Sequence, residues 1–257
     1  RVLFRSNLSK ETDTLISVVT VSYNAVSTIE QTILSVINQT YPNVEYIIID
    51  GGSTDGTVDI IKKYADKIAY WVSEPDKGIY DAMNKGVVVA TGEWINFMNA
   101  GDIFTDSDVI DKLFHQNIII NRVGIVFGDT LVVFRNREKI VRFGDDAHHK
   151  IMPSCHQSIF CRRNLLVSNP FDLRYKIAAD YNFFFQLKQR KVEFQYIQLV
   201  VAIYDATDGI SSRNVWRTQK EMMTIERNCL FIYFIRIGLL GLKLCIKKVL
   251  IVLGLKK

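Results

Sequence analysis

Short apolar runs and amphipathic segments alternate along the first part of the chain. Largely apolar runs of strand length occupy residues 16–22, 44–50 and 94–98. Between them, apolar residues recur at steps of three and four, as in segment 79–90, which is the spacing of one helix face. Strands that alternate with helices in this way predict crossover connections and a largely parallel sheet covered on both faces.

The pattern becomes less regular in the second part of the chain. Segments 123–128 and 130–134, divided near a Gly-Asp pair, favour a hairpin or a pair of strands. Residues 178–189 have the spacing of a helix, and residues 192–200 have the composition of a strand. Since no repeat or low-complexity linker separates these elements, we expect a single α/β domain.

This organisation divides the 257-residue chain into three parts. Residues 1–14 are polar and aperiodic, and we expect a loose arm without the charged and apolar regions of a signal peptide. Residues 15–210 form the expected domain, with halves 15–102 and 103–210. Residues 211–257 are a C-terminal extension of a different character.

The extension is strongly apolar, and from Leu230 onward its charges are all basic. These charges are Arg236, Lys243, Lys247, Lys248, Lys256 and Lys257. No window reaches the roughly 18–20 uninterrupted apolar residues of a spanning helix. An amphipathic helix lying in the membrane interface is the preferred interpretation, and a core helix packed on the domain is the alternative.

Composition narrows the function classes. An apolar fraction of 48% with only four prolines excludes a disordered or collagen-like chain. The four cysteines form no C-x-x-C pair, which disfavours a disulfide framework or zinc site and favours a reduced, cytoplasmic setting. The net charge of +5 suits nucleic acid, an anionic membrane or a phosphate-bearing ligand. Because the densest basic run lies in the apolar extension, we expect no nucleic-acid partner.

Polar residues follow each of the three apolar runs. The endings are Ser22-Tyr23-Asn24, Asp50-Gly51-Gly52-Ser53 and Asn99-Ala100-Gly101-Asp102. In an open α/β sheet, ligands bind outside the carboxyl ends of the strands. Asp50 beside glycines suits a base or ribose that approaches the backbone closely. Ser53 or Thr54 equally suits the cap of the next helix, with Asp55 in its first turn.

Two further segments complete an ordered set of motifs. Residues 74–86 read E-P-D-K-G-I-Y-D-A-M-N-K-G, and residues 90–97 read A-T-G-E-W-I-N-F. Over residues 15–205 the set resembles the family 2 nucleotide-sugar glycosyltransferases, closest to bacterial members that build capsule, exopolysaccharide or lipopolysaccharide. The resemblance implies a GT-A fold, with a Rossmann-like, mostly parallel sheet flanked by helices and a smaller acceptor half. It also implies inversion at the transferred sugar.

The resemblance further implies the binding partners. The donor is expected to be a nucleotide sugar, usually a UDP-sugar, and the acceptor a glycan or a polyprenyl- or other lipid-linked glycan at the inner face of the plasma membrane. The implied donor residues are Thr20, Ser22, Tyr23, Asn24, Asp50, Gly52, Ser53, Asp76, Lys77, Asp81, Asn84, Asn99, Ala100 and Gly101. Asp50 would contact the base, whereas Tyr80 and Met83 are expected to pack in the core.

The third strand ending departs from the family pattern. The family commonly carries L-D-A-D-D there, whereas this chain reads M-N-A-G-D, with Asp102 as its only carboxylate. Divalent cations such as magnesium prefer carboxylate oxygens together with substrate phosphates. We still expect manganese or magnesium at Asp102, assisted by cationic side chains.

Asp180 is the expected catalytic base. An inverting transfer needs a carboxylate within hydrogen-bond reach of the attacking hydroxyl. Asp180 falls where the family carries an acidic residue at a helix start; an N-cap role is its alternative, and Asp172 is a weaker candidate for the base. His156 and Gln157, in a polar loop, are expected to contact the diphosphate, the metal or the acceptor.

Two other function classes are weaker. A nucleotidyl-transferring enzyme would place a Gly-rich, basic loop after the first strand, and Ser22-Tyr23-Asn24-Ala25 has neither feature. A catalytically inactive nucleotide-sugar-binding protein would account for the reduced acidic motif. The retained Asp50, Asp102 and Asp180 argue against it.

Overall fold

The computed structural model describes residues 14–115, 122–135, 137–142, 151–207 and 214–226, together with Gly238. Its strands are β1 (Ile16–Ser22), β2 (Val44–Asp50), β3 (Tyr70–Ser73), β4 (Trp94–Phe97), β5 (Ile103–Phe104), β6 (Val123–Phe134), β7 (Arg137–Val141), β8 (Ile159–Arg162) and β9 (Glu193–Asp205). Its helices are α1 (Ile29–Ile37), α2 (Thr57–Lys63), α3 (Ile79–Val89), α4 (Val109–Phe114), α5 (Arg163–Ser168), α6 (Ala179–Gln189) and α8 (Val215–Glu226). Short 3-10 turns occupy η1 (Ala65–Lys67) and η3 (His156–Ser158).

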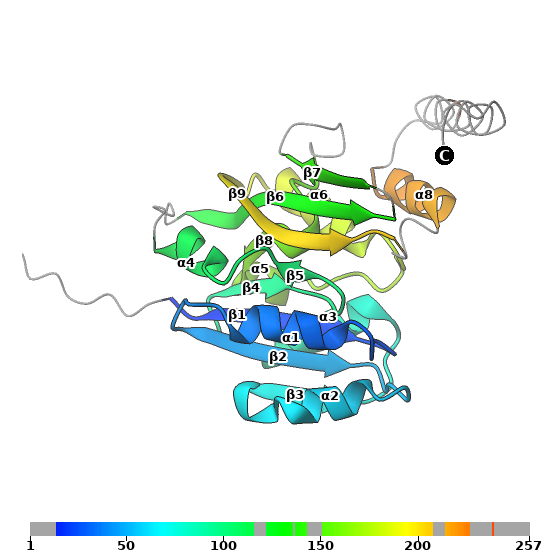
Figure 1. Ribbon diagram of the computed structural model, residues 1–257. Helices are drawn as coiled ribbons and strands as arrows, with labels where there is room; N and C mark the ends of the chain where they lie inside the picture. Colours follow the sequence, from blue (N-terminus) through cyan, green and yellow to red (C-terminus); the bar gives the residue numbers. More distant parts are fainter. Residues whose placement is uncertain are drawn as a thin grey trace, which may run out of the picture.

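The strands form one mixed sheet in the order β3-β2-β1-β4-β8-β6-β9-β5, with β7 paired to β6 (Figure 1). In the first half, β1 pairs in parallel with both β2 and β4, and β2 pairs in parallel with β3. Ser22 stands opposite Asp50 in this register, so the carboxyl ends of β1 and β2 meet at one edge. The predicted alternation of strands and helices in residues 15–102 is therefore confirmed.

The second half mixes both directions. Strand β8 lies antiparallel between β4 and β6, and β6 runs parallel to β9. Through β8, the carboxyl ends of β4, β6 and β9 point to the same side of the sheet. Strand β9 is also longer than the predicted strand 192–200.

The predicted division between segments 123–128 and 130–134 is wrong. Strand β6 runs without interruption through Gly128, and the hairpin forms later, where β6 turns into β7. A Cβ on Gly128 would lie 2.4 Å from the carbonyl oxygen of Leu199 in β9. The glycine therefore permits a close approach of two backbones, and the register between β6 and β9 shifts there as in a β-bulge.

Two apolar layers cover the sheet, as expected for strands buried on both faces. Helices α1, α2 and α4 cover one face, where the core includes Ile33, Ile48 and Phe160. Helices α3, α5 and α6 cover the other face, where the core includes Met83 and Phe183. The helices on both faces leave the carboxyl edge of the strands free for polar loops.

Helix α8 is the described part of the C-terminal extension. Its Ile225 packs against Ala178 and Tyr181 of the α6 region, and the Tyr181 hydroxyl donates to the Glu226 carboxylate. The basic, apolar sequence predicted to bind the membrane interface lies outside the described residues, as does the arm 1–14 except for Thr14. Within the described ranges, no helix has the length and apolarity needed to cross a membrane.

Candidate functional site

The Asp50 carboxylate holds together the carboxyl ends of β1, β2 and β3. Asp50 is fully buried, and its Oδ1 accepts hydrogen bonds from the hydroxyls of Ser22 at 2.8 Å and Ser53 at 2.6 Å. Its Oδ2 accepts from the Ser73 hydroxyl at 2.6 Å and from the backbone N–H groups of Gly52 at 3.1 Å and Ser53 at 2.8 Å. Burial alone would raise the pKa of Asp50, but these donors outweigh it and the pKa is lowered. The charged carboxylate thus shapes the 51–55 loop.

A second set of hydrogen bonds joins the loops after β1 and β2. Asn24, in the left-handed region with φ 47°, accepts the Thr54 N–H at 3.0 Å through its Oδ1 and donates its own N–H to Ser53 Oγ at 2.7 Å. Asp55 accepts the N–H of Thr57, the first residue of α2, at 3.0 Å. The N-cap residue of α2 is Gly56, so the predicted cap at Ser53 or Thr54 is wrong, and Asp55 lies before the helix rather than in its first turn.

Tyr23 and Asp76 both pack against Gly51, beside these loops. The Tyr23 ring is 67% exposed. A Cβ on Gly51 would lie 2.6 Å from Asp76 Oδ2 and 3.3 Å from Tyr23 Cδ2, so a side chain there would collide with the carboxylate. The other Asp76 oxygen, Oδ1, accepts the Gly78 N–H at 2.7 Å. An exposed aromatic ring and a carboxylate oxygen therefore lie together here, and they suit the face and an N–H group of a nucleotide base.

Three other predicted donor residues form hydrogen bonds within the domain. Thr20 is fully buried and donates to the Met98 carbonyl at 2.8 Å, inside the sheet. Asn84 bonds both backbone groups of Phe171 at 2.9 Å, which ties α3 to the second half of the domain. Lys77 is exposed, and its N–H donates to Asp81 in the first turn of α3 at 3.0 Å.

Asp102 lies at the end of β4, beside Gln157. Only 6% of Asp102 is exposed, and its Oδ2 accepts from Gln157 Nε2 at 2.8 Å. Burial raises the pKa of Asp102 to about 6, although the Gln157 hydrogen bond opposes this effect. Before it, Gly101 has φ +105° and donates its N–H to Thr32 at 3.0 Å, which turns the chain toward the site.

Two buried amide oxygens near Asp102 have no hydrogen-bond partner among the residues that the structure describes. They are Asn99 Oδ1 and Gln157 Oε1. Buried acceptors of this kind are usually paired, so they point to a missing donor or cation. Amide and carboxylate oxygens are the ligands that hard divalent cations prefer, and the residues present fit such an ion. Among the described residues, no three His, Cys, Asp or Glu side chains form a metal cluster, so Asp102 would be the only carboxylate ligand here.

His156 connects the end of β4 with α6. Its Nε2 lies 2.8 Å from Asn99 Nδ2, and its Nδ1 lies 3.6 Å from Asp180 Oδ2. When the Asn99 amide donates to Nε2, the proton of the neutral ring is on Nδ1, facing Asp180. The structure thus brings Asn99, Asp102, His156, Gln157 and Asp180 together.

Asp180 is the second residue of α6, and the N-cap position belongs to Ala178, so the predicted N-cap alternative is wrong. Its Oδ1 accepts the Tyr181 N–H at 2.8 Å and lies 2.9 Å from the Tyr80 hydroxyl. Its Oδ2 accepts no hydrogen bond from any residue that the structure describes; its contact is with His156. Of the two carboxylate oxygens, Oδ2 is the one available to receive a proton.

Tyr80, for which the sequence favours packing over a role at the donor, also contacts Asp180. It is buried and contacts the Phe171 ring, with centroids 5.5 Å apart, as the packing role predicts. Its hydroxyl also lies 2.7 Å from the Ile177 carbonyl. Burial and the nearby charge of Asp180 raise the pKa of Tyr80 well above its usual value, so it remains a hydrogen-bond donor.

Asp172, the weaker candidate for the base, is engaged elsewhere. Arg174 donates to it through Nε at 3.0 Å and through Nη2 at 2.6 Å. The Arg174 guanidinium lowers the pKa of Asp172, although burial opposes this effect. This bidentate pair leaves Asp180 as the better-placed carboxylate.

Glu221 of α8 holds the backbone before α6, and no pattern in the sequence distinguishes it. Its Oε2 accepts the backbone N–H groups of Ile177 at 2.9 Å and Ala178 at 3.1 Å, which immediately precede α6. Arg217 donates to the other oxygen, Oε1, at 3.0 Å. Burial would raise the pKa of Glu221, but these donors lower it. Helix α8 therefore fixes the start of the helix that carries Asp180.

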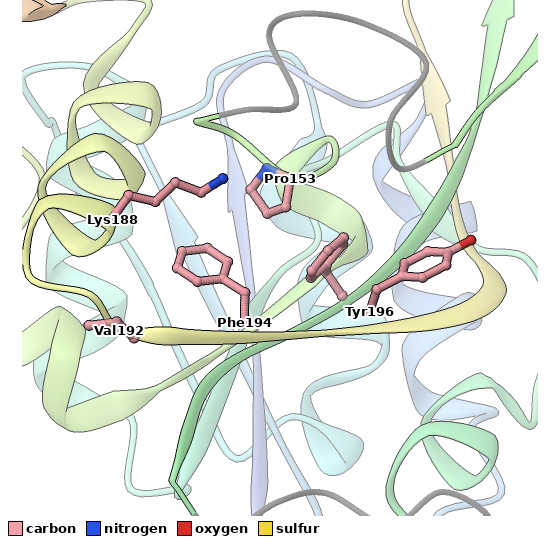
Figure 2. A pocket seen from close by; sticks show the side chains of 6 residues that line it. Pro153, Lys188, Val192, Phe194 and Tyr196 are labelled. Atoms are coloured by element: carbon pink, nitrogen blue, oxygen red, sulfur yellow. The ribbon is translucent and has the colours of Figure 1, made fainter.

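An apolar cavity of about 360 Å³ lies beyond Pro153, three residues before His156. Figure 2 shows Lys188 reaching from α6 toward Pro153, with Phe194 and Tyr196 below. The Lys188 Nζ lies 5.3 Å from the Phe194 ring centroid, and burial lowers its pKa. The lining of this cavity is mainly apolar, whereas a nucleotide diphosphate needs polar groups such as those at the strand ends.

Known proteins are similar to this chain in sequence. The model of Glycosyl transferase family 2 matches residues 17–162. The PGL/p-HBAD biosynthesis glycosyltransferase of Mycobacterium bovis (strain BCG / Pasteur 1173P2) is 30% identical over 203 residues, which cover 77% of this chain and 79% of that protein. The cholesterol galactosyltransferase of Borreliella burgdorferi is 26% identical over 215 residues, 77% of this chain and 58% of that protein.

Solved structures with low sequence identity show the same fold. S. aureus TarS 1–349 in complex with UDP-GlcNAc superposes with a TM-score of 0.65 at 16% identity, over 83% of this chain and 64% of that one. The mannosyltransferase PcManGT from Pyrobaculum calidifontis, in complex with GDP-Man and Mn2+, gives 0.64 at 20% identity, over 88% of this chain and 65% of that one. The chain thus spans just under two thirds of each of these proteins. Its predicted GT-A architecture is confirmed, and the chain belongs to glycosyltransferase family 2.

Proposed function

We propose that this glycosyltransferase moves a sugar from a UDP-sugar to an acceptor hydroxyl by a single displacement that inverts the anomeric carbon. The observation that carries the proposal is the free oxygen Oδ2 of Asp180, which faces His156 beside the unpaired oxygens of the β4 end. This arrangement supplies a proton acceptor and a diphosphate-binding edge within one site.

The side chains beside Gly51 support a base-binding role. The exposed Tyr23 ring provides a surface on which a base stacks, and Asp76 Oδ2 provides an acceptor for the N–H of uracil. The absent side chain at Gly51 allows the base to approach the backbone. The TarS structure with UDP-GlcNAc supports a uridine nucleotide, and the GDP-Man complex of PcManGT makes guanosine the competing donor to test.

We propose that Mn2+ or Mg2+ is held by Asp102 and by the unpaired oxygens Asn99 Oδ1 and Gln157 Oε1. When bound, such an ion neutralises charge on the leaving diphosphate. The Mn2+ in the PcManGT complex supports this role in a protein of the same fold. The Gln157 amide that donates to Asp102 also orients that carboxylate toward the site.

In the proposed reaction, Asp180 receives the proton of the acceptor hydroxyl. The acceptor oxygen forms the new bond to the anomeric carbon while the bond to the diphosphate oxygen breaks, and the hydroxyl proton passes to Asp180 Oδ2. Tyr80 and the Tyr181 N–H hold Oδ1, which fixes the orientation of the carboxylate. His156, held by Asn99, lies next to the other oxygen, Oδ2, on the side of the β4 end.

The acceptor is proposed to be a glycan or a lipid-linked molecule in cell-surface glycan synthesis. The name of one relative, the cholesterol galactosyltransferase of Borreliella burgdorferi, supports a lipid acceptor. The basic, apolar sequence from Leu230 onward supports a peripheral position on the cytoplasmic face of the membrane. Co-sedimentation with anionic vesicles tests this position; a protein that stays in the supernatant would contradict it.

A thermal-shift screen of nucleotide sugars tests the donor assignment. We expect UDP-sugars to raise the melting temperature, and Mn2+ to increase the shift, because ligands that bind only the folded state stabilise it. GDP-mannose should give the smaller shift. The proposal is wrong if no nucleotide sugar stabilises the protein, and the uridine assignment is wrong if GDP-mannose gives the larger effect.

Substitution of Glu221 tests how α8 supports Asp180. Glu221→Ala leaves the N–H groups of Ile177 and Ala178 without their acceptor, so Asp180 loses its fixed position. We expect kcat to fall by about tenfold, the scale of one lost charge-assisted hydrogen bond, while KM for the donor is unchanged. Glu221→Gln keeps an acceptor oxygen and should recover most of the activity. A purely structural role would instead lower the melting temperature and leave kcat of the folded fraction intact.

A further inference from the structure

A second cavity lies under α8, between this helix and the loop that precedes α6. Its volume is about 570 Å³. Its walls combine cationic and aromatic side chains: Arg174, Tyr175, Trp216, Arg217, Lys220, Glu221 and Thr224. None of the cationic or aromatic residues among them belongs to the donor or metal site described above.

The charges around this cavity are mostly positive. Glu221 is the only acidic residue among its walls, and its Oε2 already accepts two backbone N–H groups. Arg217 uses only Nε to reach Glu221, and Arg174 uses Nε and Nη2 to reach Asp172. Each guanidinium is therefore held in place while some of its five N–H donors remain for a ligand. Lys220 has no ion pair within the described part of the chain.

Aromatic surface accompanies these cations. Trp216 is 51% exposed, which is high for the largest apolar side chain on a helix. On the opposite wall, the Arg174 guanidinium carbon lies 5.9 Å from the centroid of the Tyr175 ring. Cations beside open aromatic faces suit a ligand that carries an anionic group next to a sugar or an apolar group.

The cavity is connected to the catalytic carboxylate. Glu221, one of its walls, bonds the N–H groups of Ile177 and Ala178, and Asp180 follows two residues later. Figure 1 shows α8 on the side toward which β2, β6 and β9 point, which is the side of the donor site. A ligand in the cavity would therefore lie next to the first turn of α6.

We propose that this cavity binds a phosphate or diphosphate ester of the acceptor. The inference rests on the proposed function, since it names the acceptor class of the same site. The guanidinium groups of Arg174 and Arg217 and the ammonium group of Lys220 bind the phosphate oxygens. Trp216 packs against the group joined to the phosphate. The acceptor's hydroxyl then extends past the Glu221-held backbone toward Asp180.

The test is a calorimetric titration with inorganic pyrophosphate and with farnesyl diphosphate, with the donor site filled by excess UDP and without added metal. Lys220→Glu should weaken the affinity for both probes by about tenfold or more, the scale of a lost charge-assisted hydrogen bond to phosphate. Lys67→Glu makes the same change of charge on the exposed 3-10 turn beside β3. It should leave both affinities unchanged. Equal losses in the two variants would overturn the proposal.

Two further arms separate the possible sources of the phosphate. Trp216→Ala should weaken the binding of farnesyl diphosphate more than the binding of pyrophosphate. If the Lys220-dependent binding appears only with phosphatidylglycerol vesicles and with neither soluble probe, the cavity binds a membrane headgroup and the proposal is wrong. UDP binding is measured separately for each variant. If the wild-type protein does not bind UDP, the proposed function is wrong. If it binds UDP but does not bind pyrophosphate, only this inference is wrong.

Discussion

Asp180→Asn is expected to lower kcat for sugar transfer by about 10² to 10⁴-fold, the usual contribution of a general base. The amide keeps the shape of the side chain and still accepts the Tyr181 N–H and the Tyr80 hydroxyl bond. It cannot take the proton of the acceptor hydroxyl. Steady-state assays should therefore show a loss in kcat, with the affinity for UDP, measured by titration, unchanged.

Asp172→Asn is the matched comparison, because Asp172 was the other candidate for the base. Arg174 holds Asp172 in a bidentate pair, away from the role of proton acceptor. Its substitution should leave most of the transfer activity. If Asp172→Asn is the inactive variant and Asp180→Asn retains activity, the assignment of the base is reversed.

Asp50→Asn is expected to reduce the free energy of unfolding by about 3 kcal/mol, the range for breaking a buried, hydrogen-bonded charge. Asp50 receives three hydroxyl and two backbone hydrogen bonds and has no exposed surface. An amide at this position directs its own NH₂ group toward these donors. Urea unfolding should show the loss, and the affinity for UDP should fall with it because the 51–55 loop is no longer held.

The effect depends on pH in a defined direction. The pKa of Asp50 is lowered in the folded state, so its stabilisation is fully present above the unfolded-state value of about 3.9. It is lost as the pH falls through the lower, folded-state pKa. The difference between the wild type and Asp50→Asn should therefore be constant near neutral pH and shrink in strong acid. Asp59→Asn, which removes an exposed ion pair with Lys62, should change stability by less than about 0.5 kcal/mol. An equal loss in both variants would contradict the account of Asp50.

The regular half of the fold could be predicted because its signals are local. The runs of β1, β2 and β4 are largely apolar, and each is followed by polar residues. Gly128 shows where local signals mislead. A glycine followed by aspartate is typical of a turn, but here the glycine admits the Leu199 carbonyl of β9, a residue distant in sequence. No local pattern distinguishes a turn from such a close approach.

The site shows the same division between local and distant information. Asp180, His156 and Asn99 could be named from motifs, but their connection depends on β8 pairing with β4 and on the packing of α6. Tyr80 is 100 residues from Asp180, and Glu221 is 44 residues from Ile177. Each looked like an ordinary helix residue, because only the tertiary packing brings them to the base.

The reduced acidic motif at the end of β4 is also clearer in the structure. Where the family commonly carries an acidic pair, this chain places Asn99 and Gly101, and Asp102 alone keeps a carboxylate. Asn99 and Gln157 leave two buried oxygens unpaired beside it. In the proposed cation site, these amide oxygens replace some of the missing carboxylate ligands.

The central claim is a single displacement in which Asp180 accepts the proton. Its most direct test is proton NMR of the sugar that the protein releases from a UDP-α-sugar when water replaces the acceptor. The account predicts that the β-anomer appears first, before mutarotation, and that Asp180→Asn releases almost none. Release of the α-anomer by the wild-type protein, or unchanged release by Asp180→Asn, would contradict it.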